Sequence, residues 1–288
     1  MQYALNLPIG GSGSDPRILA EFAALAEEVG WDGVFLEDYI VYTNTTYHSL
    51  PGFPTHDPWI ALAAMAMSTK RIRLGTTVTP LSRRRPWKLA RETVSLDHLS
   101  GGRLILGAGA GDVRDSGFAR VGEVTDAKQR AEMLDESLTI LTGLWSGEPF
   151  SYHGTHYDVD DVTFLPRPIQ TPRIPIWIGG GWPLRAPVRR AAHWDGACLY
   201  KETDDDEGQD MTSVDVSALK RAIEQERPTD TPFAIVVGGR QRRDDWEEER
   251  AHIRSVAQAG ATWWVEWIAA ADVDAMRAAI KCGPLRID

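Results

Sequence analysis

Short apolar runs rich in β-branched and aromatic residues alternate with stretches of helical periodicity along the whole chain. The first run covers residues 3–7. Beyond it, Asp15 is a suitable helix N-cap and Pro16 a suitable first helical residue. Apolar side chains then recur about every 3.6 residues as far as Gly30, a residue type that commonly ends helices. The pattern predicts one β-strand followed by one amphipathic helix.

The same unit of strand and helix repeats along the sequence. The predicted strands are residues 3–7, 33–37, 72–78, 104–107, 174–178, 196–200, 233–237 and 262–268. The predicted helices are residues 16–29, 58–67, 86–99, 126–145, 184–193, 214–225, 246–259 and 272–280. Apolar strands that alternate with amphipathic helices indicate a parallel sheet. Eight such units favour an α/β fold closed into a (β/α)8 TIM barrel over a doubly wound sheet.

One segment interrupts this rhythm before the fifth predicted strand. Residues 150–159 have the alternation of a β-hairpin that turns at His153-Gly154, within an insertion of about residues 149–166. The sequence contains no linker and no low-complexity segment, so residues 1–288 are expected to form one barrel domain. The acidic stretch 203–211 is expected to form a loop after the sixth strand.

Composition excludes several classes of protein. The 31 basic and 41 acidic residues give a net charge of −10, which disfavours a nucleic-acid partner. The two cysteines, Cys198 and Cys282, form no CxxC pair, so neither a disulfide framework nor a zinc site is expected, and the seven histidines lack metal-ligand spacing. Neither a signal peptide nor an apolar run of about 20 residues is present, so we expect no membrane span and a cytoplasmic location.

A TIM barrel holds its active site at the carboxyl ends of its strands, and several polar or glycine-rich segments fall there. Glu37 and Asp38 follow the second strand, and only one of two adjacent carboxylates can point into the barrel. Residues 107–111 carry alternate glycines and lead to Asp112. They allow close approach of a ligand to the backbone, or they form an ordinary barrel turn. The basic triplet 83–85 either meets an anionic group or is a solvated face.

A second glycine cluster, Gly179, Gly180 and Gly181, stands between the fifth predicted strand and a predicted helix N-terminus. Backbone N–H groups and the helix dipole would make an anion site there, and the alternative is a tight turn. No GK[ST] follows these glycines, so the segment is not a P-loop. The chain also lacks the GxSxG elbow of serine hydrolases.

Several segments together resemble the bacterial luciferase-like family of flavin-dependent monooxygenases and oxidoreductases. The segments that carry this resemblance are residues 72–76, 96–111, 144–149, 152–157 and 175–180. The resemblance extends from residue 3 to about residue 200, and the last third of the chain matches the family only in its rhythm of strands and helices. It implies a (β/α)8 barrel with an insertion before strand five, and either FMN or the deazaflavin coenzyme F420 bound at the strand ends.

The resemblance also implies roles for individual residues. Thr76, Thr77 and Val78 would contact the cofactor ring, and the family's non-proline cis peptide would lie between Thr77 and Val78. The residues expected to complete the cofactor site are Gly109, Ala110 and Gly111 in a wall, and Gly179, Gly180 and Gly181 in a phosphate-binding turn.

The deazaflavin branch often has Asp-His after strand two, and here the pair is Asp38-Tyr39. A tyrosine has a pKa near about 10, so Tyr39 is a poor general base, although it can donate a hydrogen bond or stack on a ring. We therefore expect Asp38, Tyr39 and Asp112 to be catalytic. Tyr42 and Trp59 are expected to line the substrate side, beneath a lid formed by loop 40–57. The choice between FMN and coenzyme F420 stays open.

The expected function is that of an oxidoreductase acting on a small organic substrate. With reduced FMN it would activate O₂, with a flavin reductase as a candidate partner, and with coenzyme F420 it would transfer hydride. Exposed apolar positions, expected among the eleven tryptophans, favour a homodimer. The alternatives are a non-catalytic flavin-binding protein on the same fold and a cofactor-free barrel hydrolase.

Overall fold

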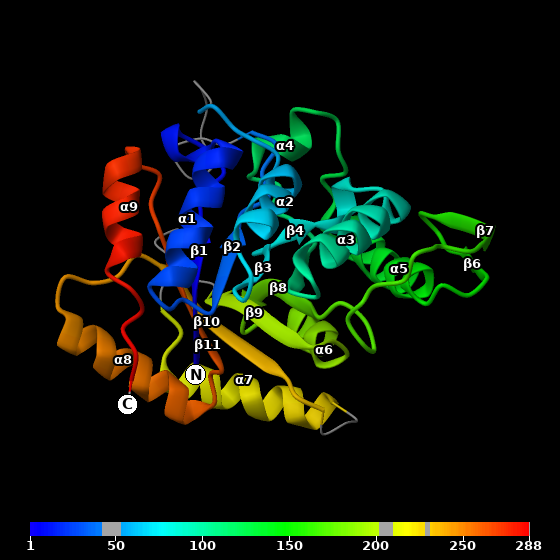
Figure 1. Cartoon of the computed structure of the whole chain (residues 1–288). Coiled ribbons are helices and arrows are strands. Elements are labelled where there is room, and N and C mark those ends of the chain that lie inside the picture. Colours follow the sequence, from blue (N-terminus) through cyan, green and yellow to red (C-terminus); the bar gives the residue numbers. More distant parts are fainter. Residues whose placement is uncertain (42–52, 202–209, 228–230, 288) are drawn as a thin grey trace.

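Apolar segments pair as parallel strands that close on themselves in the computed structural model, which describes residues 1–41, 53–201, 210–227 and 231–287 (Figure 1). The barrel strands are β1 (Gln2–Leu7), β2 (Gly33–Leu36), β3 (Arg73–Thr76) with its continuation β4 (Thr79–Pro80), β5 (Leu104–Gly109), β8 (Ile176–Trp182), β9 (Gly196–Lys201), β10 (Ala234–Arg240) and β11 (Trp263–Trp267). The barrel closes because β1 pairs with both β2 and β11, and β3 pairs with β5. The predicted (β/α)8 barrel is confirmed.

Helices follow the strands and surround the barrel (Figure 1). They are α1 (Pro16–Glu28), α2 (Pro58–Ser68), α3 (Pro86–Ser100), α5 (Ala127–Trp145), α6 (Arg185–Ala192), α7 (Ser213–Glu226), α8 (Trp246–Ala259) and α9 (Val273–Lys281). Asp15 caps α1 as predicted, because its carboxylate accepts a hydrogen bond of 2.8 Å from the Arg17 N–H. Three short elements were not predicted: η1 (Ser12–Ser14), η2 (Leu81–Arg83) and α4 (Ser116–Ala119).

The predicted hairpin is present as β6 (Phe150–His153) and β7 (Asp158–Val162), which lie beyond α5 and away from the barrel (Figure 1). Glu136 on α5 holds its turn. The buried carboxylate of Glu136 accepts hydrogen bonds from the backbone N–H groups of Thr155, His156 and Tyr157 at 2.8–3.3 Å. The insertion is therefore tied to the helix before it.

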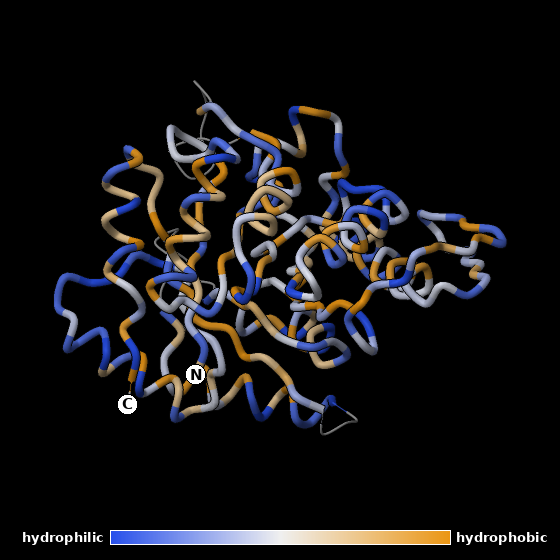
Figure 2. Tube along the Cα trace, viewed as in Figure 1, coloured by the Kyte–Doolittle hydropathy of each residue, from blue (hydrophilic) through white to orange (hydrophobic). Residues whose placement is uncertain are grey.

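Apolar side chains fill the space on both sides of the strands. Outward-facing residues pack under the helices, while Phe35, Trp177 and Trp263 meet inside the barrel with ring centroids 5.1–6.0 Å apart. Figure 2 shows the same division, with hydrophobic colours on β10 and mostly hydrophilic ones on α8 beside it. Among the described residues, no helix is long and apolar enough to cross a membrane.

The predicted ends of β5, β8 and β10 fall two to four residues too early, and the largest error is at β8. The fifth predicted strand was expected to end at residue 178, with a glycine turn after it. In the structure β8 runs through Gly179, Gly180 and Gly181, which pair with Cys198, Leu199 and Tyr200 of β9, and α6 begins only at Arg185. The glycines therefore belong to the barrel wall. Both cysteines, Cys198 and Cys282, are free, as expected.

Candidate active site

The barrel opens at the carboxyl ends of its strands. Register places Phe35, Ile105, Trp177, Val236 and Trp263 on the inner face, where all are buried. Other inward positions are partly exposed, among them Thr77, Gly179, Cys198 and Trp267. Solvent therefore reaches the interior from this end and stops at the aromatic layer, which is the end where TIM barrels hold their active sites.

The segment between β3 and β4 crosses this opening. The Thr77–Val78 peptide bond is cis, as the family resemblance predicted. The Thr77 hydroxyl donates to Asn6 Oδ1 at 2.9 Å. The Thr76 hydroxyl donates to the Gly107 carbonyl at 3.1 Å and accepts from the Thr79 hydroxyl at 3.0 Å. The polar groups of this segment are thus held by β1, β4 and β5.

Val78 lies against the glycines of the two neighbouring strands. A Cβ atom at Gly109 would lie 2.7 Å from Val78 Cγ2, and one at Gly179 would lie 2.8 Å from Val78 Cγ1. Real side chains do not approach so closely, so both positions must stay glycine for Val78 to sit there. The structure therefore brings the predicted residues Val78, Gly109 and Gly179 together in one wall with little side chain.

The wall continues into Ala110 and Gly111. The Ala110 carbonyl accepts from the Ser82 hydroxyl at 2.9 Å, and Arg130 donates to the carbonyls of Ala110 and Gly111. Gly111 has φ = 78°, a left-handed conformation that favours glycine. Buried Arg130 thus fixes this loop from behind, a contact that sequence reasoning did not anticipate.

Asp38 is 4% exposed and is engaged in an ion pair. Its carboxylate accepts from Arg84 Nε at 3.0 Å and from Arg84 Nη2 at 2.7 Å, while Arg83 Nη2 lies 3.7 Å away. Burial lowers the pKa of Arg84, but the charge and hydrogen bonds of Asp38 outweigh burial and raise that pKa above its ordinary value. The Asp38 carboxylate thus forms a two-pronged contact with Arg84.

The basic triplet fits neither of its sequence-based interpretations. Arg83, whose side chain is 1% exposed, pairs with the Asp115 carboxylate, donates to the Asp38 carbonyl and lies over the Phe118 ring at 4.9 Å. Arg84 binds Asp38, and only Arg85 is exposed. Two arginines therefore tie the end of β2 to η2 and α4. The sequence analysis did not predict these contacts, because it did not predict the short helix α4, whose N-cap is Asp115.

The other predicted residues are spread more widely. Asp112 pairs with Arg114, whose Nη2 lies 2.7 Å from Asp112 Oδ2, and its side chain is one-third exposed. Tyr39 is half-buried against the core under the helices. Trp59 on α2 is buried, with the Arg84 guanidinium 5.9 Å from its ring. Tyr42 and most of the predicted lid 40–57 lie outside the described residues.

A second ionic cluster at the end of β10 was not predicted. Arg240 bridges Asp210 and the fully buried Glu249, with an Nη2–Oε2 distance of 2.8 Å to Glu249. Arg242 Nη2 lies 3.0 Å from Glu266 Oε2 on β11. Burial raises the pKa of Glu266 above its ordinary value, although Arg242 opposes the shift. The Gly-Gly-Arg sequence that ends β10 could have indicated a charged group at the end of this strand. The carboxylates that pair with Arg240 lie on other segments, so the sequence did not identify them.

The end of β9 carries a third cluster. Lys201 Nζ lies 3.0 Å from Asp215 Oδ2, and Trp182 Nε1 donates to Asp215 Oδ1 at 3.2 Å. Asp215 also forms a capping box with Thr212 at the start of α7. Burial opposes ionisation of Asp215, but these hydrogen bonds prevail and lower its pKa to about 2.

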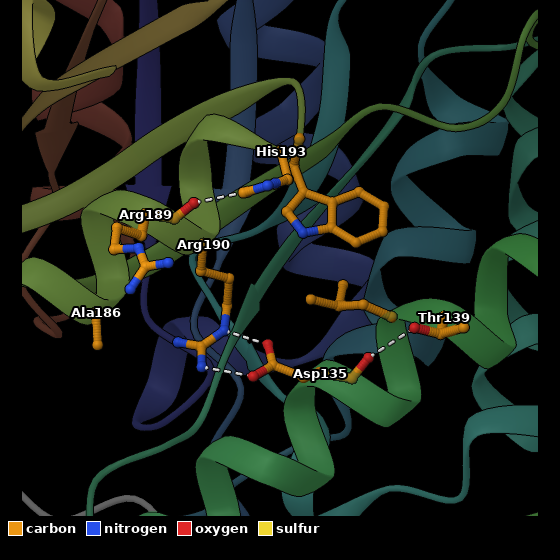
Figure 3. Close-up of a pocket in the computed structure, with 8 residues that line it drawn as sticks. Asp135, Thr139, Ala186, Arg189, Arg190 and His193 are labelled. Atoms are coloured by element: carbon orange, nitrogen blue, oxygen red, sulfur yellow. Dashed lines mark hydrogen bonds and ion pairs between the residues drawn. The ribbon is translucent and has the colours of Figure 1, made fainter. Parts of the chain in front are cut away.

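A separate pocket of about 410 Å³ lies outside the barrel, between α5 and α6 (Figure 3). Asp135 and Thr139 of α5 face Ala186, Arg189 and Arg190 of α6 across it, and Arg190 Nη2 donates to Asp135 Oδ2 at 3.0 Å. None of its lining residues comes from a barrel strand. We therefore take the barrel opening as the candidate active site.

The sequence profile of the luciferase-like monooxygenase family matches residues 2–280. The chain belongs to this family. F420-dependent glucose-6-phosphate dehydrogenase of Microbacterium testaceum is 37% identical over 169 residues, which are 58% of this chain and 48% of that protein. The protein of the same name from Gordonia bronchialis is 31% identical over 224 residues, 73% of this chain and 64% of that protein. This luciferase-like chain thus spans about half the length of the first relative.

Solved structures share the fold of this luciferase-like chain. An F420-dependent secondary alcohol dehydrogenase in complex with an F420–acetone adduct has a TM-score of 0.77 at 15% identity, and 99% of each chain is covered. Monooxygenase RslO1 from Streptomyces bottropensis has a TM-score of 0.72 at 20% identity, with 98% of this chain and 97% of that one covered. At these identities the likeness concerns the fold alone.

Proposed function

We propose that this protein is an oxidoreductase that transfers hydride between coenzyme F420 and a small organic substrate. The observation that carries the proposal is the wall with little side chain that Val78, Gly109 and Gly179 form at the open end of the barrel. The relatives named as F420-dependent dehydrogenases support coenzyme F420 over FMN.

The residues of the opening fit a planar ring cofactor. Gly109 and Gly179 carry no side chain, and Val78 fills the space that side chains there would need, so this part of the wall is built with little side chain. Thr76, Thr77 and Val78 would back the ring, and Gly109, Ala110 and Gly111 would flank it. Backbone N–H groups near Gly179, Gly180 and Gly181 would meet the cofactor phosphate. When bound, the deazaflavin would accept one hydride from a substrate carbon as the hydroxyl proton leaves to a base or water, which oxidises an alcohol to a carbonyl.

The chain's own residues orient the partners and handle the proton. The Asp38–Arg84 pair and the Thr77–Asn6 hydrogen bond hold two sides of the opening in place. Tyr39 and Asp112 remain our candidates for contacts to the reacting atoms, with Tyr39 as a hydrogen-bond donor. Tyr42 and Trp59 remain candidates for the substrate side. Asp38 now fits a charge partner of Arg84 better than a free proton carrier.

Parallel fluorescence titrations of the purified chain test the proposal. We expect micromolar binding of coenzyme F420 and at least about tenfold weaker binding of FMN. The deazaflavin chromophore without its phosphate is the matched control, and it should bind more weakly if the Gly179–Gly181 strand end holds the phosphate. Tighter binding of FMN would favour O₂ activation with a reductase partner. Binding of neither cofactor would overturn the proposal.

A further inference from the structure

We propose that the active site takes an uncharged alcohol or carbonyl compound and does not take a sugar phosphate. This inference rests on the proposed function and names its substrate class. It is based on the ion pairs that arginine and lysine side chains at the carboxyl ends of the strands already form. A phosphate dianion is bound in proteins by charge-assisted hydrogen bonds, most often from arginine or lysine.

The buried cations on the β2–β5 side are already engaged. Arg83 is paired with Asp115, and Arg84 grips Asp38 with two nitrogens. Arg130 is 6% exposed and donates to the carbonyls behind the wall. A substrate phosphate would have to displace a buried carboxylate or reach behind the wall to meet any of these groups.

The cations on the β9–β10 side are engaged as well. Lys201 is paired with Asp215 at 3.0 Å, inside the cap of α7. Arg240 and Arg243 share Asp210, whose carboxylate oxygens lie 2.5 and 2.7 Å from their nitrogens. Arg242 is paired with Glu266. Each cation on this side is thus paired with a carboxylate, and among the buried nitrogens of these groups only Arg242 Nη1 lacks a hydrogen-bond partner.

The remaining cations at this end are exposed to water. Examples are Arg120, which ends α4, and Arg185, which begins α6. Solvent screens such charges, so their contribution to a specific phosphate site is small. The sequence around the opening therefore disfavours a dianion.

Apart from Glu37, two residues beyond inward-facing Phe35, the inner lining is mostly apolar and uncharged. Val78, Cys198 and Trp267 are inward-facing and partly exposed at this level, above the aromatic layer. Removal from bulk water raises the pKa of the Cys198 thiol to about 12, so this group is neutral at pH 7. The amide of Asn6 and the hydroxyl of Thr77 bind each other. Such a surface matches a substrate held by apolar contact, with few polar anchors.

Calorimetric titration of inorganic phosphate and glucose 6-phosphate into the full chain with coenzyme F420 bound tests the inference, because the cofactor then fills its own phosphate site. We expect no saturable binding of inorganic phosphate or glucose 6-phosphate below about 10 mM, because the cations are occupied. Asp210→Asn removes the carboxylate shared by Arg240 and Arg243, so this variant should gain phosphate binding. Glu247→Gln, which changes an exposed carboxylate on α8, is the control and should gain none. Millimolar or tighter binding of either phosphate by the unmodified chain with coenzyme F420 bound would overturn the inference, whether or not Asp210→Asn folds.

A second measurement separates this inference from the proposed function. With bound coenzyme F420, absorbance should report faster cofactor reduction by a neutral secondary alcohol than by glucose 6-phosphate. Glucose and glucose 6-phosphate are a matched pair, and a preference for the phosphate ester above about tenfold would contradict the inference alone. Failure of coenzyme F420 to bind would remove the proposed function together with its phosphate site, and the same titration of the chain alone would then decide whether the opening accepts a dianion.

Discussion

The side chain of Val78 occupies the space that side chains at Gly109 and Gly179 would need. This contact joins three segments that are far apart in the sequence, and it gives the two glycines a packing role besides any contact with a ligand. Interiors packed to this density tolerate added atoms poorly, because neighbours must leave their preferred rotamers. The wall of the proposed cofactor site is therefore sensitive to single methyl groups.

We predict that Gly179→Ala lowers the free energy of unfolding by about 1–3 kcal/mol, because the new methyl group meets Val78 Cγ1. In a Val78→Ala background the nearest remaining atom, the Val78 Cβ position, is 3.5 Å away, which is ordinary contact. The double variant should recover much of the loss, and urea unfolding of the four proteins measures the coupling. An equal cost of Gly179→Ala in both backgrounds would show that the clash does not exist.

The sequence predicted which glycine segments lie at the strand ends, because the order of strands alone determines that. It did not predict what each glycine faces. Asp38 is a similar case, since its place after β2 was clear but its pairing with Arg84 was not. Partner choice depends on where η2 turns, and a three-residue helix leaves no periodic signal.

At the scale of elements, α7 shows how a helix cap couples to a strand end. Asp215 satisfies the Thr212 N–H and hydroxyl, binds Lys201 of β9 and accepts from Trp182 of β8. These bonds all favour the ionised carboxylate, so the pKa of Asp215 is lower in the folded chain than in the unfolded one. A lowered folded-state pKa contributes stability above the unfolded pKa, and this stability is lost as pH falls.

We predict that Asp215→Asn lowers the free energy of unfolding by about 2 kcal/mol at pH 7. The difference from the unmodified chain should shrink as pH falls from about 4 toward 2, since Asp215 becomes protonated in both states. Urea unfolding at several pH values measures the difference. Asp160→Asn in the exposed hairpin strand β7 is the control. A difference that stays constant down to pH 2 would contradict the assigned pKa.

Most helix boundaries were predictable because capping residues and apolar spacing mark them locally, as at Asp15 and Gly30. The end of β8 was not predictable in that way. Glycine is depleted in strands, so three consecutive glycines read as a turn. They are tolerated in β8 because β9 supplies the ladder partners and Val78 supplies the packing. Tertiary contacts thus override local preference at this strand.

At the scale of the whole molecule, repetition made the barrel predictable even where the family resemblance faded. The last third of the chain matched the family only in rhythm, yet the family profile extends to residue 280. The ionic clusters around the opening were not predictable, because 31 basic and 41 acidic residues allow very many pairings and only distances select among them. The fold could therefore be predicted from the sequence, whereas the ion pairs around its site could not.

The surface of α2 carries the last prediction, which concerns assembly. This helix, Pro58–Ser68, contains no charged residue, and its outward side chains Ile60 and Met67 are 65% and 71% exposed. They stand seven positions apart and share one face. A helix that is apolar on all sides is normally buried, so we predict a homodimer in which α2 is covered by a second copy of the chain.

Sedimentation at micromolar concentration should give twice the mass of one chain for the unmodified protein. Ile60→Glu combined with Met67→Glu should give the mass of one chain with an unchanged circular dichroism spectrum, because two buried carboxylates without partners oppose association. Val214→Glu changes an apolar side chain on α7 that is 73% exposed, and it should leave the mass doubled. If the α2 variant sediments as the unmodified protein does, the interface lies elsewhere and α2 is simply an apolar surface helix.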